Sequence, residues 1–242
     1  MTDDANAGRM RAVANPPDLV QRLKDAMTLH QQGKLAEAEI LYQRVLAHRP
    51  NNVDALHNLG LIRLHQRKFE QAVQLIGQAL VAGPNSARAH SNFAVALQAL
   101  GHQEMALDHC EKALSIRPDY AEAHNNAALA LRSLSRPEEA LAHFAKALTI
   151  RPNYADALNN CASLLQSLDR HEEAVDHFSK SLALAPNQVD AHFELGISLM
   201  ALGRQADAAA QFQQTLALKP NHANAQKRMQ AIRESAILPS EP

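Results

Sequence analysis

The sequence lacks tryptophan, and its three tyrosines and six phenylalanines give an aromatic fraction of only 4%. Glycine is scarce too, at eight of 242 residues. Few β-branched or aromatic residues therefore remain to build a sheet. The chain is instead rich in alanine, leucine, glutamine and glutamate, which are strong helix formers. The composition predicts an all-α fold.

The sequence also lacks an excess of charge: 24 basic and 25 acidic side chains leave a net charge of −1. A nucleic-acid partner is therefore not expected, because such proteins usually present a basic face. No run approaches the roughly 18 apolar residues of a membrane span, and residues 1–17 lack the apolar core of a secretory signal. The two cysteines, Cys110 and Cys161, lie far apart in the sequence, so we expect buried, reduced thiols rather than a disulfide framework. These absences favour a cytoplasmic protein without a membrane partner.

Proline shows a strict period. Six of the eleven prolines recur every 34 residues, at Pro50, Pro84, Pro118, Pro152, Pro186 and Pro220. The period defines six units: 19–52, 53–86, 87–120, 121–154, 155–188 and 189–222. A position is hereafter a residue's place within its unit, with Leu19 at position 1. Repeats of this length are typical of stacked helical units.

Each unit is predicted to form two helices, over positions 2–14 and 18–30. Position 20 is always alanine, position 28 always leucine and position 8 always alanine or glycine. Apolar residues at positions 20, 21, 24, 27 and 28 form one stripe with helical spacing. The proline at position 32 ends the second helix, because it disfavours helical geometry at the residue before it. Small residues at positions 8 and 20 let the helix axes approach closely, and stacking of the units buries the remaining apolar face.

These columns, with an aromatic residue favoured at position 24 and a small one at 27, resemble the tetratricopeptide repeat (TPR). The resemblance covers residues 19–222 and implies a right-handed superhelical solenoid whose first helices line a concave surface. Three departures are local. Leucine or histidine stands at position 4 of units two to six in place of the family's tryptophan, Arg63 stands at position 11 in place of leucine, and Ile76 and Cys110 stand at position 24. Residues 223–235 are predicted to form a capping helix. Residues 1–18 and 236–242 are predicted to be a disordered lead and tail.

No enzyme motif is present, since the sequence has no Gly-rich phosphate loop, no Gly-x-Ser-x-Gly and no His-Glu-x-x-His. We therefore expect no catalytic residue, cofactor or metal. Histidines recur at position 23, but sites about 10 Å apart cannot share a zinc ion that needs its ligands at about 2 Å. They are predicted to be solvated surface residues: His109, His143 and His177. The basic residues at position 16 are predicted to form a solubilising edge, with an anionic partner as the alternative: Lys34, Lys68, Arg136, Arg170 and Arg204.

Asparagine recurs at position 6, in the middle of four first helices: Asn58, Asn92, Asn126 and Asn160. Asparagine is a poor helix former, so a functional reason is plausible for the column. A side-chain amide both donates and accepts, and so can pair with either group of a peptide backbone. A spacing of about 10 Å matches roughly three residues of extended chain. The column is predicted to be a ladder that holds an extended peptide; the alternative is that it was merely copied during repeat duplication.

Position 2 lies one turn earlier on the same helix face. It holds Arg88 in the third repeat and acidic residues in four others: Asp54, Glu122, Asp156 and Asp190. They are predicted to bind basic or hydroxyl side chains of the peptide. The stretch from Ala121 to Asn126 resembles the repeats of O-GlcNAc transferase. That resemblance implies peptide contacts at the four asparagines, with Asp156 and Asp190 as side-chain readers.

The sequence thus predicts a TPR scaffold that binds an extended protein or peptide segment. One alternative is a substrate-docking region for an O-GlcNAc-transferase-like enzyme, whose catalytic region would have to lie on another chain or beyond a fragment. Another is homo-oligomeric assembly. A carboxylate clamp for chaperone C-termini is disfavoured, because Leu23 and Met27 stand where its lysine and asparagine would be needed.

Overall fold

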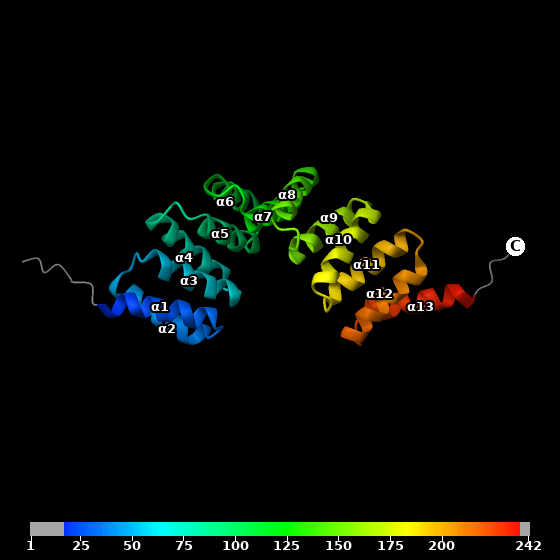
Figure 1. Cartoon of the computed structure of the whole chain (residues 1–242), viewed down its shortest axis with the longest axis horizontal. Helices are drawn as coiled ribbons and strands as arrows, with labels where there is room; N and C mark the ends of the chain where they lie inside the picture. Colours follow the sequence, from blue (N-terminus) through cyan, green and yellow to red (C-terminus); the bar gives the residue numbers. More distant parts are fainter. Residues whose placement is uncertain (1–16, 238–242) are drawn as a thin grey trace, which may run out of the picture. The chain divides into compact units, whose positions relative to one another are not determined.

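The computed structural model describes residues 17–237, which form thirteen α-helices and contain no strand (Figure 1). The all-α prediction is confirmed. The chain forms two compact units that divide after Ala96. The first unit contains α1 (Pro17–Gln31), α2 (Leu35–His48), α3 (Val53–His65), α4 (Phe69–Ala82) and most of α5 (Ala87–Ala99). The second contains α6 (Gln103–Ile116), α7 (Ala121–Ser133), α8 (Pro137–Ile150), α9 (Ala155–Ser167), α10 (His171–Leu184), α11 (Val189–Ala201), α12 (Gln205–Leu218) and α13 (Ala223–Ile237).

Consecutive helices pack as pairs within each unit. In the first unit α1 packs on α2 and α3 on α4, and α2 also contacts α3. In the second unit the pairs are α7 with α8, α9 with α10, and α11 with α12, and α13 packs against α12. The first helices of these pairs also contact one another, α7 with α9 and α9 with α11. The second unit therefore presents a continuous row of first helices.

The helix ends follow the proline period. Each second helix ends at position 30, and the residue before the proline is extended, as at Arg151 with φ −132° and ψ 90°. Proline imposes this geometry on the preceding residue, so the predicted helix stop is confirmed. The inner first helices run over positions 1–13 rather than 2–14, as α3 does, and two terminal boundaries also need correction. The first helix already begins at Pro17, where a proline suits the first turn, and α13 extends to Ile237. The predicted disorder of residues 1–16 and 238–242 lies outside the described residues.

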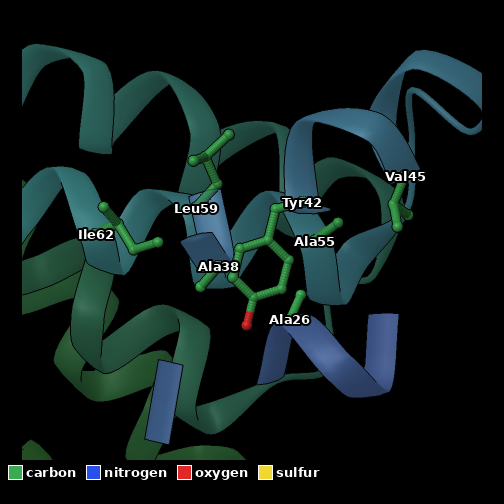
Figure 2. Close-up of a cluster of buried hydrophobic side chains, with 7 residues drawn as sticks. All are labelled: Ala26, Ala38, Tyr42, Val45, Ala55, Leu59 and Ile62. Atoms are coloured by element: carbon green, nitrogen blue, oxygen red, sulfur yellow. The ribbon is translucent and has the colours of Figure 1, made fainter. Parts of the chain in front are cut away.

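The small residues of the pattern lie in the core. All six alanines at position 20 are fully buried. A Cβ atom added at Gly60 would fall 2.5 Å from Ile76 Cγ1, and one added at Gly196 would fall 2.5 Å from Phe212 Cε1. Position 8 therefore faces position 24 across the helix pair, which explains why it must be small. Figure 2 shows the equivalent site in the first repeat, where the ring of Tyr42 lies among small side chains of neighbouring helices.

Both cysteines are buried and free, as predicted. Cys110 occupies position 24, where other repeats carry an aromatic ring, and is completely buried. Burial raises the pKa of Cys110 to about 12 and that of Cys161 to about 11. Thiols that stay protonated in this way behave as small apolar core groups.

Arg63 departs from the repeat pattern because it has a charged partner in the neighbouring repeat. Its Nη2 lies 2.6 Å from Glu39 Oε1 and its Nη1 lies 2.9 Å from Glu39 Oε2. Both side chains are largely covered, with 11% and 21% of their surfaces exposed. The pair joins α3 to α2 in two parallel hydrogen bonds, a geometry that favours arginine over lysine.

Candidate functional site

The asparagines of position 6 lie mid-way along the first helices, and each is hydrogen-bonded within the protein. Asn92 Nδ2 lies 3.0 Å from His57 Nε2, and Asn160 Nδ2 donates to Asn125 Oδ1 at 3.1 Å. In both cases position 6 bonds to position 5 of the preceding repeat. These two amides therefore tie adjacent first helices together, a role that the repeat pattern does not reveal because position 5 varies from repeat to repeat.

The other two asparagines have different partners. Asn58 is buried, and its Nδ2 donates to the backbone oxygen of Asp54 at 2.8 Å. Asn126 Oδ1 accepts from Asn125 Nδ2 at 3.4 Å, while its backbone oxygen accepts from Gln98 Nε2 at 2.6 Å. The four amides thus share a position in the repeat but not a common bonding pattern.

His57 is the most strongly shifted histidine beside this column, with only 3% of its surface exposed. Burial lowers its pKa to about 4, and the positive charges of Arg88 and His30 lower it further. The neutral ring offers an unprotonated nitrogen to the Asn92 amide. The His57–Asn92 contact is thus maintained at neutral pH.

The acidic residues of position 2 divide into a paired and an unpaired group. Glu122 forms an ion pair with Arg151, whose guanidinium lies over the Tyr154 ring at 4.6 Å from its centroid. Asp54, Asp156 and Asp190 are exposed and have no ion-pair partner among residues 18–234. Three of the four acidic residues predicted to contact peptide side chains are therefore not engaged in an ion pair.

A cavity of about 340 Å³ lies beside Asp190, and the sequence analysis did not anticipate it. It is lined by Asn159 and Ser163 of α9, Phe178 of α10, and Asp190 and Glu194 of α11. Glu194 stands at position 6, in the place that asparagine takes in the four preceding repeats. The departure of Glu194 from that column is the one sequence signal that could have located the cavity.

The histidines of position 23 are not solvated surface residues, so that prediction is wrong. His143 and His177 are half-buried, and His143 Nδ1 lies 3.0 Å from His124 Nδ1. Burial, followed by the charges of His124 and Lys146, lowers the pKa of His143 to about 4. Burial likewise lowers the pKa of His177. Position 23 faces position 4 of the same repeat, which covers it.

Position 4 has a structural role of its own. The Nε2 atoms of His90, His124 and His192 lie 2.9, 3.1 and 2.8 Å from the backbone oxygens of Pro84, Pro118 and Pro186. A ring N–H thus satisfies the carbonyl of the proline between consecutive repeats, which accounts for histidine in place of the family's tryptophan. No cluster of three or more potential metal ligands occurs in the described part of the chain.

The basic residues of position 16 immediately precede the second helices, and the three arginines among them bind acidic residues of the first turn. Arg136 Nε lies 2.7 Å from Glu139 Oε1, and Arg170 Nε lies 2.6 Å from Glu173 Oε1. These hydrogen bonds lower the pKa of both carboxyl groups. The pairs are exposed, so the charge of this edge is locally neutralised at its arginines.

Paired helices, a 34-residue period and a small residue packed against position 24 define a helical repeat protein. Tetratricopeptide-repeat family models match residues 29–101, 85–153, 119–187 and 162–223. The chain belongs to the tetratricopeptide repeat family. No curated protein matches the sequence significantly. Among residues 17–237, none of the helices combines the length and apolar character needed to cross a bilayer.

Several solved structures share this fold. PilW, a type IV pilus biogenesis factor, is 19% identical with a TM-score of 0.79, over 90% of this chain and all of that one. A chain of the APC/C hetero-tetramer Cut9–Hcn1 is 16% identical with a TM-score of 0.79, over 88% of this chain but 42% of that one. YrrB, described as a TPR protein with an unusual peptide-binding site, is 17% identical with a TM-score of 0.60, over 78% of this chain and 97% of that one. At these identities the likeness establishes the fold alone.

Proposed function

We propose that this protein is an interaction scaffold that binds an extended peptide segment of a partner along its first helices. The asparagines of position 6 would hold the peptide backbone: Asn58, Asn92, Asn126 and Asn160. The acidic residues of position 2 would contact its side chains: Asp54, Glu122, Asp156 and Asp190. The TPR fold, which this chain shares with complex-forming and peptide-binding proteins, supports a role in protein–protein interaction.

The observation that carries the proposal is the arrangement of amides on neighbouring first helices. Asn126 lies on α7 and Asn160 on α9, and these helices contact one another. The hydrogen bond from Asn160 to Asn125 uses one amide hydrogen. The second amide hydrogen and the side-chain oxygen of Asn160 have no partner among the described residues. An amide can offer both of these groups to a peptide backbone.

The test must separate ligand binding from the inter-repeat bonds of the same amides. A random 12-residue peptide display library is selected against the wild-type protein, and the recovered peptides are titrated by fluorescence anisotropy. We expect the N58A/N92A/N126A/N160A variant to lose their binding while its circular dichroism remains helical. Unchanged affinity in that variant would contradict the proposal.

Asn125→Ala provides the matched control. It removes the hydrogen bonds that the Asn125 side chain makes to Asn160 and Asn126 but keeps all four proposed ligand-binding side chains. We expect N125A to lose stability and to retain peptide binding. If N125A instead loses binding as completely as the quadruple variant, the asparagines act only by holding the helices together.

Two finer points belong to the same proposal. The buried, free thiols support a reducing, cytoplasmic location. Docking for an O-GlcNAc-transferase-like catalytic chain stays a prediction, tested by assaying co-purified complexes for glycosyl transfer. Homo-oligomerisation also stays a prediction, tested by light scattering at two protein concentrations.

A further inference from the structure

The cavity between α9, α10 and α11 contains one buried acceptor that has no donor. Asn159 Nδ2 donates to Gln188 Oε1, which fixes the orientation of the Asn159 amide. The other amide atom, Asn159 Oδ1, is buried and has no hydrogen-bond partner. A buried acceptor without a donor costs about 1–3 kcal/mol, so it calls for an explanation.

The preceding repeat shows how the same acceptor is normally satisfied. There, position 5 is Asn125, and its Oδ1 accepts a hydrogen bond from Asn160 Nδ2 at 3.1 Å. The equivalent pair in the cavity is Asn159 at position 5 and Glu194 at position 6. An ionised glutamate has only acceptors, so Glu194 cannot donate to Asn159. The exchange of asparagine for glutamate therefore leaves Asn159 Oδ1 without a donor, whereas the Glu194 carboxyl receives one hydrogen bond, from Gln166.

The cavity is also short of positive charge. Asp190 and Glu194 lie four residues apart on the same face of α11, and no basic residue lines the cavity. Burial raises the pKa of Glu194 and the charge of Asp190 adds to that rise, while a hydrogen bond from Gln166 and the nearby His222 oppose it. A cation entering the cavity would relieve both the repulsion and the loss of solvation.

The chain already contains an arginine bound to an equivalent carboxylate. Glu122 occupies position 2 of the fourth repeat, as Asp190 does in the sixth, and forms an ion pair with Arg151. The same guanidinium lies over the ring of Tyr154. This pair shows that a carboxylate at position 2 can receive a guanidinium.

We propose that this cavity is an arginine-binding subsite, which takes one arginine side chain of the peptide segment inferred above. The planar guanidinium supplies five N–H donors. It bonds to the carboxylates of Asp190 and Glu194 and directs a donor toward Asn159 Oδ1. The arginine stem lies against the apolar wall that Phe178 provides. The subsite rests on the proposed function and adds to it the chemistry of the preferred residue.

The test titrates the full chain with Nα-acetyl-arginine amide as the probe and with Nα-acetyl-glutamine amide as its uncharged counterpart. Amide-detected NMR of the protein monitors binding. We expect the arginine probe to shift the backbone amides of residues 189–194 and the Asn159 side-chain amide, and the glutamine probe to shift neither. Added salt should weaken the response, because exposed charge pairs are screened.

Glu194→Asn is the decisive variant, because it restores the asparagine of the other repeats and can donate to Asn159 Oδ1 as Asn160 does to Asn125. We expect E194N to fold at least as stably as wild type and to bind the arginine probe at least about tenfold more weakly. Glu172→Gln removes one negative charge at an exposed site of α10 and should leave binding unchanged. Absence of shifts in wild type, or equal binding by E194N, would overturn the subsite.

The two proposals fail separately. The cavity includes none of Asn58, Asn92, Asn126 and Asn160, so the quadruple alanine variant should still respond to the arginine probe. Probe binding without peptide binding in wild type refutes the scaffold proposal alone. Peptide binding that shows no preference for arginine, and that E194N leaves unchanged, refutes the subsite alone.

Discussion

His124 and His143 face each other with their Nδ1 atoms 3.0 Å apart. His124 Nε2 lies 3.1 Å from the backbone oxygen of Pro118, so that nitrogen carries a proton. In a neutral His124 ring Nδ1 must then accept, and His143 Nδ1 must donate. A second proton on His124 would place two N–H groups against each other. The pair is therefore built for the neutral state.

The first prediction follows from this pair and concerns pH. Because the pKa of His143 falls from 6.5 to about 4 on folding, the unfolded chain binds more protons in that window. The stability contributed is complete above about pH 6.5 and is lost as the pH falls toward 4. We expect the melting temperature to be lower at pH 5 than at pH 7.5.

His143→Gln tests the assignment, because it copies Gln211, which stands beside His192 in the last repeat at 2.8 Å. The variant should show a smaller fall in melting temperature between pH 7.5 and pH 5 than wild type. Part of the fall will persist, because His57 also has a pKa of about 4. An equal fall in both proteins would show that His143 does not contribute.

The second prediction concerns the Arg63–Glu39 pair. Arg63→Leu restores the leucine of the other repeats but leaves Glu39 partly buried without its cation, and we expect a loss of about 2–3 kcal/mol in the free energy of unfolding. The double variant E39L/R63L should regain most of that loss, because it replaces two charges by apolar packing. Urea unfolding of the four proteins in a double-mutant cycle measures the coupling. Additive losses would mean that the two side chains do not interact.

The third prediction concerns the contact of Gly196 with Phe212. Gly196→Ala places a Cβ atom 2.5 Å from Phe212 Cε1, so α11 or the ring must move. Overpacking of this kind costs about 1–3 kcal/mol. The double variant G196A/F212L should recover part of that cost, as measured by chemical denaturation. A single variant as stable as wild type would show that the helix pair adapts freely.

The fourth prediction concerns the turn between the two helices of a repeat. Position 15 has a positive φ in every repeat, with glycine in three of them and Arg67, Ser135 and Asp169 in the others, where φ is 56–58°. This region is unfavourable for residues with a Cβ, so Ser135→Gly should raise the free energy of unfolding by about 0.5–1 kcal/mol. The same exchange at Ser133, the last residue of α7, removes the hydrogen bond that its Oγ donates to the Leu129 backbone oxygen and should lower the free energy of unfolding instead. Thermal unfolding of both variants gives the comparison, and a stabilised S133G would contradict the argument.

Much of the fold could be predicted because its determinants are local and repeated. Proline at position 32, alanine at position 20 and a small residue at position 8 act within one helix pair, and each recurs in register. Errors arose where a polar side chain meets a partner that local periodicity does not reveal. His143 meets His124 from 19 residues away, and Asn160 meets Asn125 from 35 residues away. The same limit hid the cavity beside Asp190, which draws its lining from three helices.

The sequence alone determined the period, the helix boundaries to within one or two residues, the family and the residues at which helices must approach closely. These features follow from backbone geometry and side-chain size, and each repeat carries the residues that determine them. Only the tertiary structure decided which polar groups are already satisfied. Asn160 has its partner in Asn125 and Glu122 has its partner in Arg151, whereas Asn159 Oδ1 has none. Hydrogen bonding requires atoms within about 3 Å of each other, and that proximity is set by the packing of one repeat on the next.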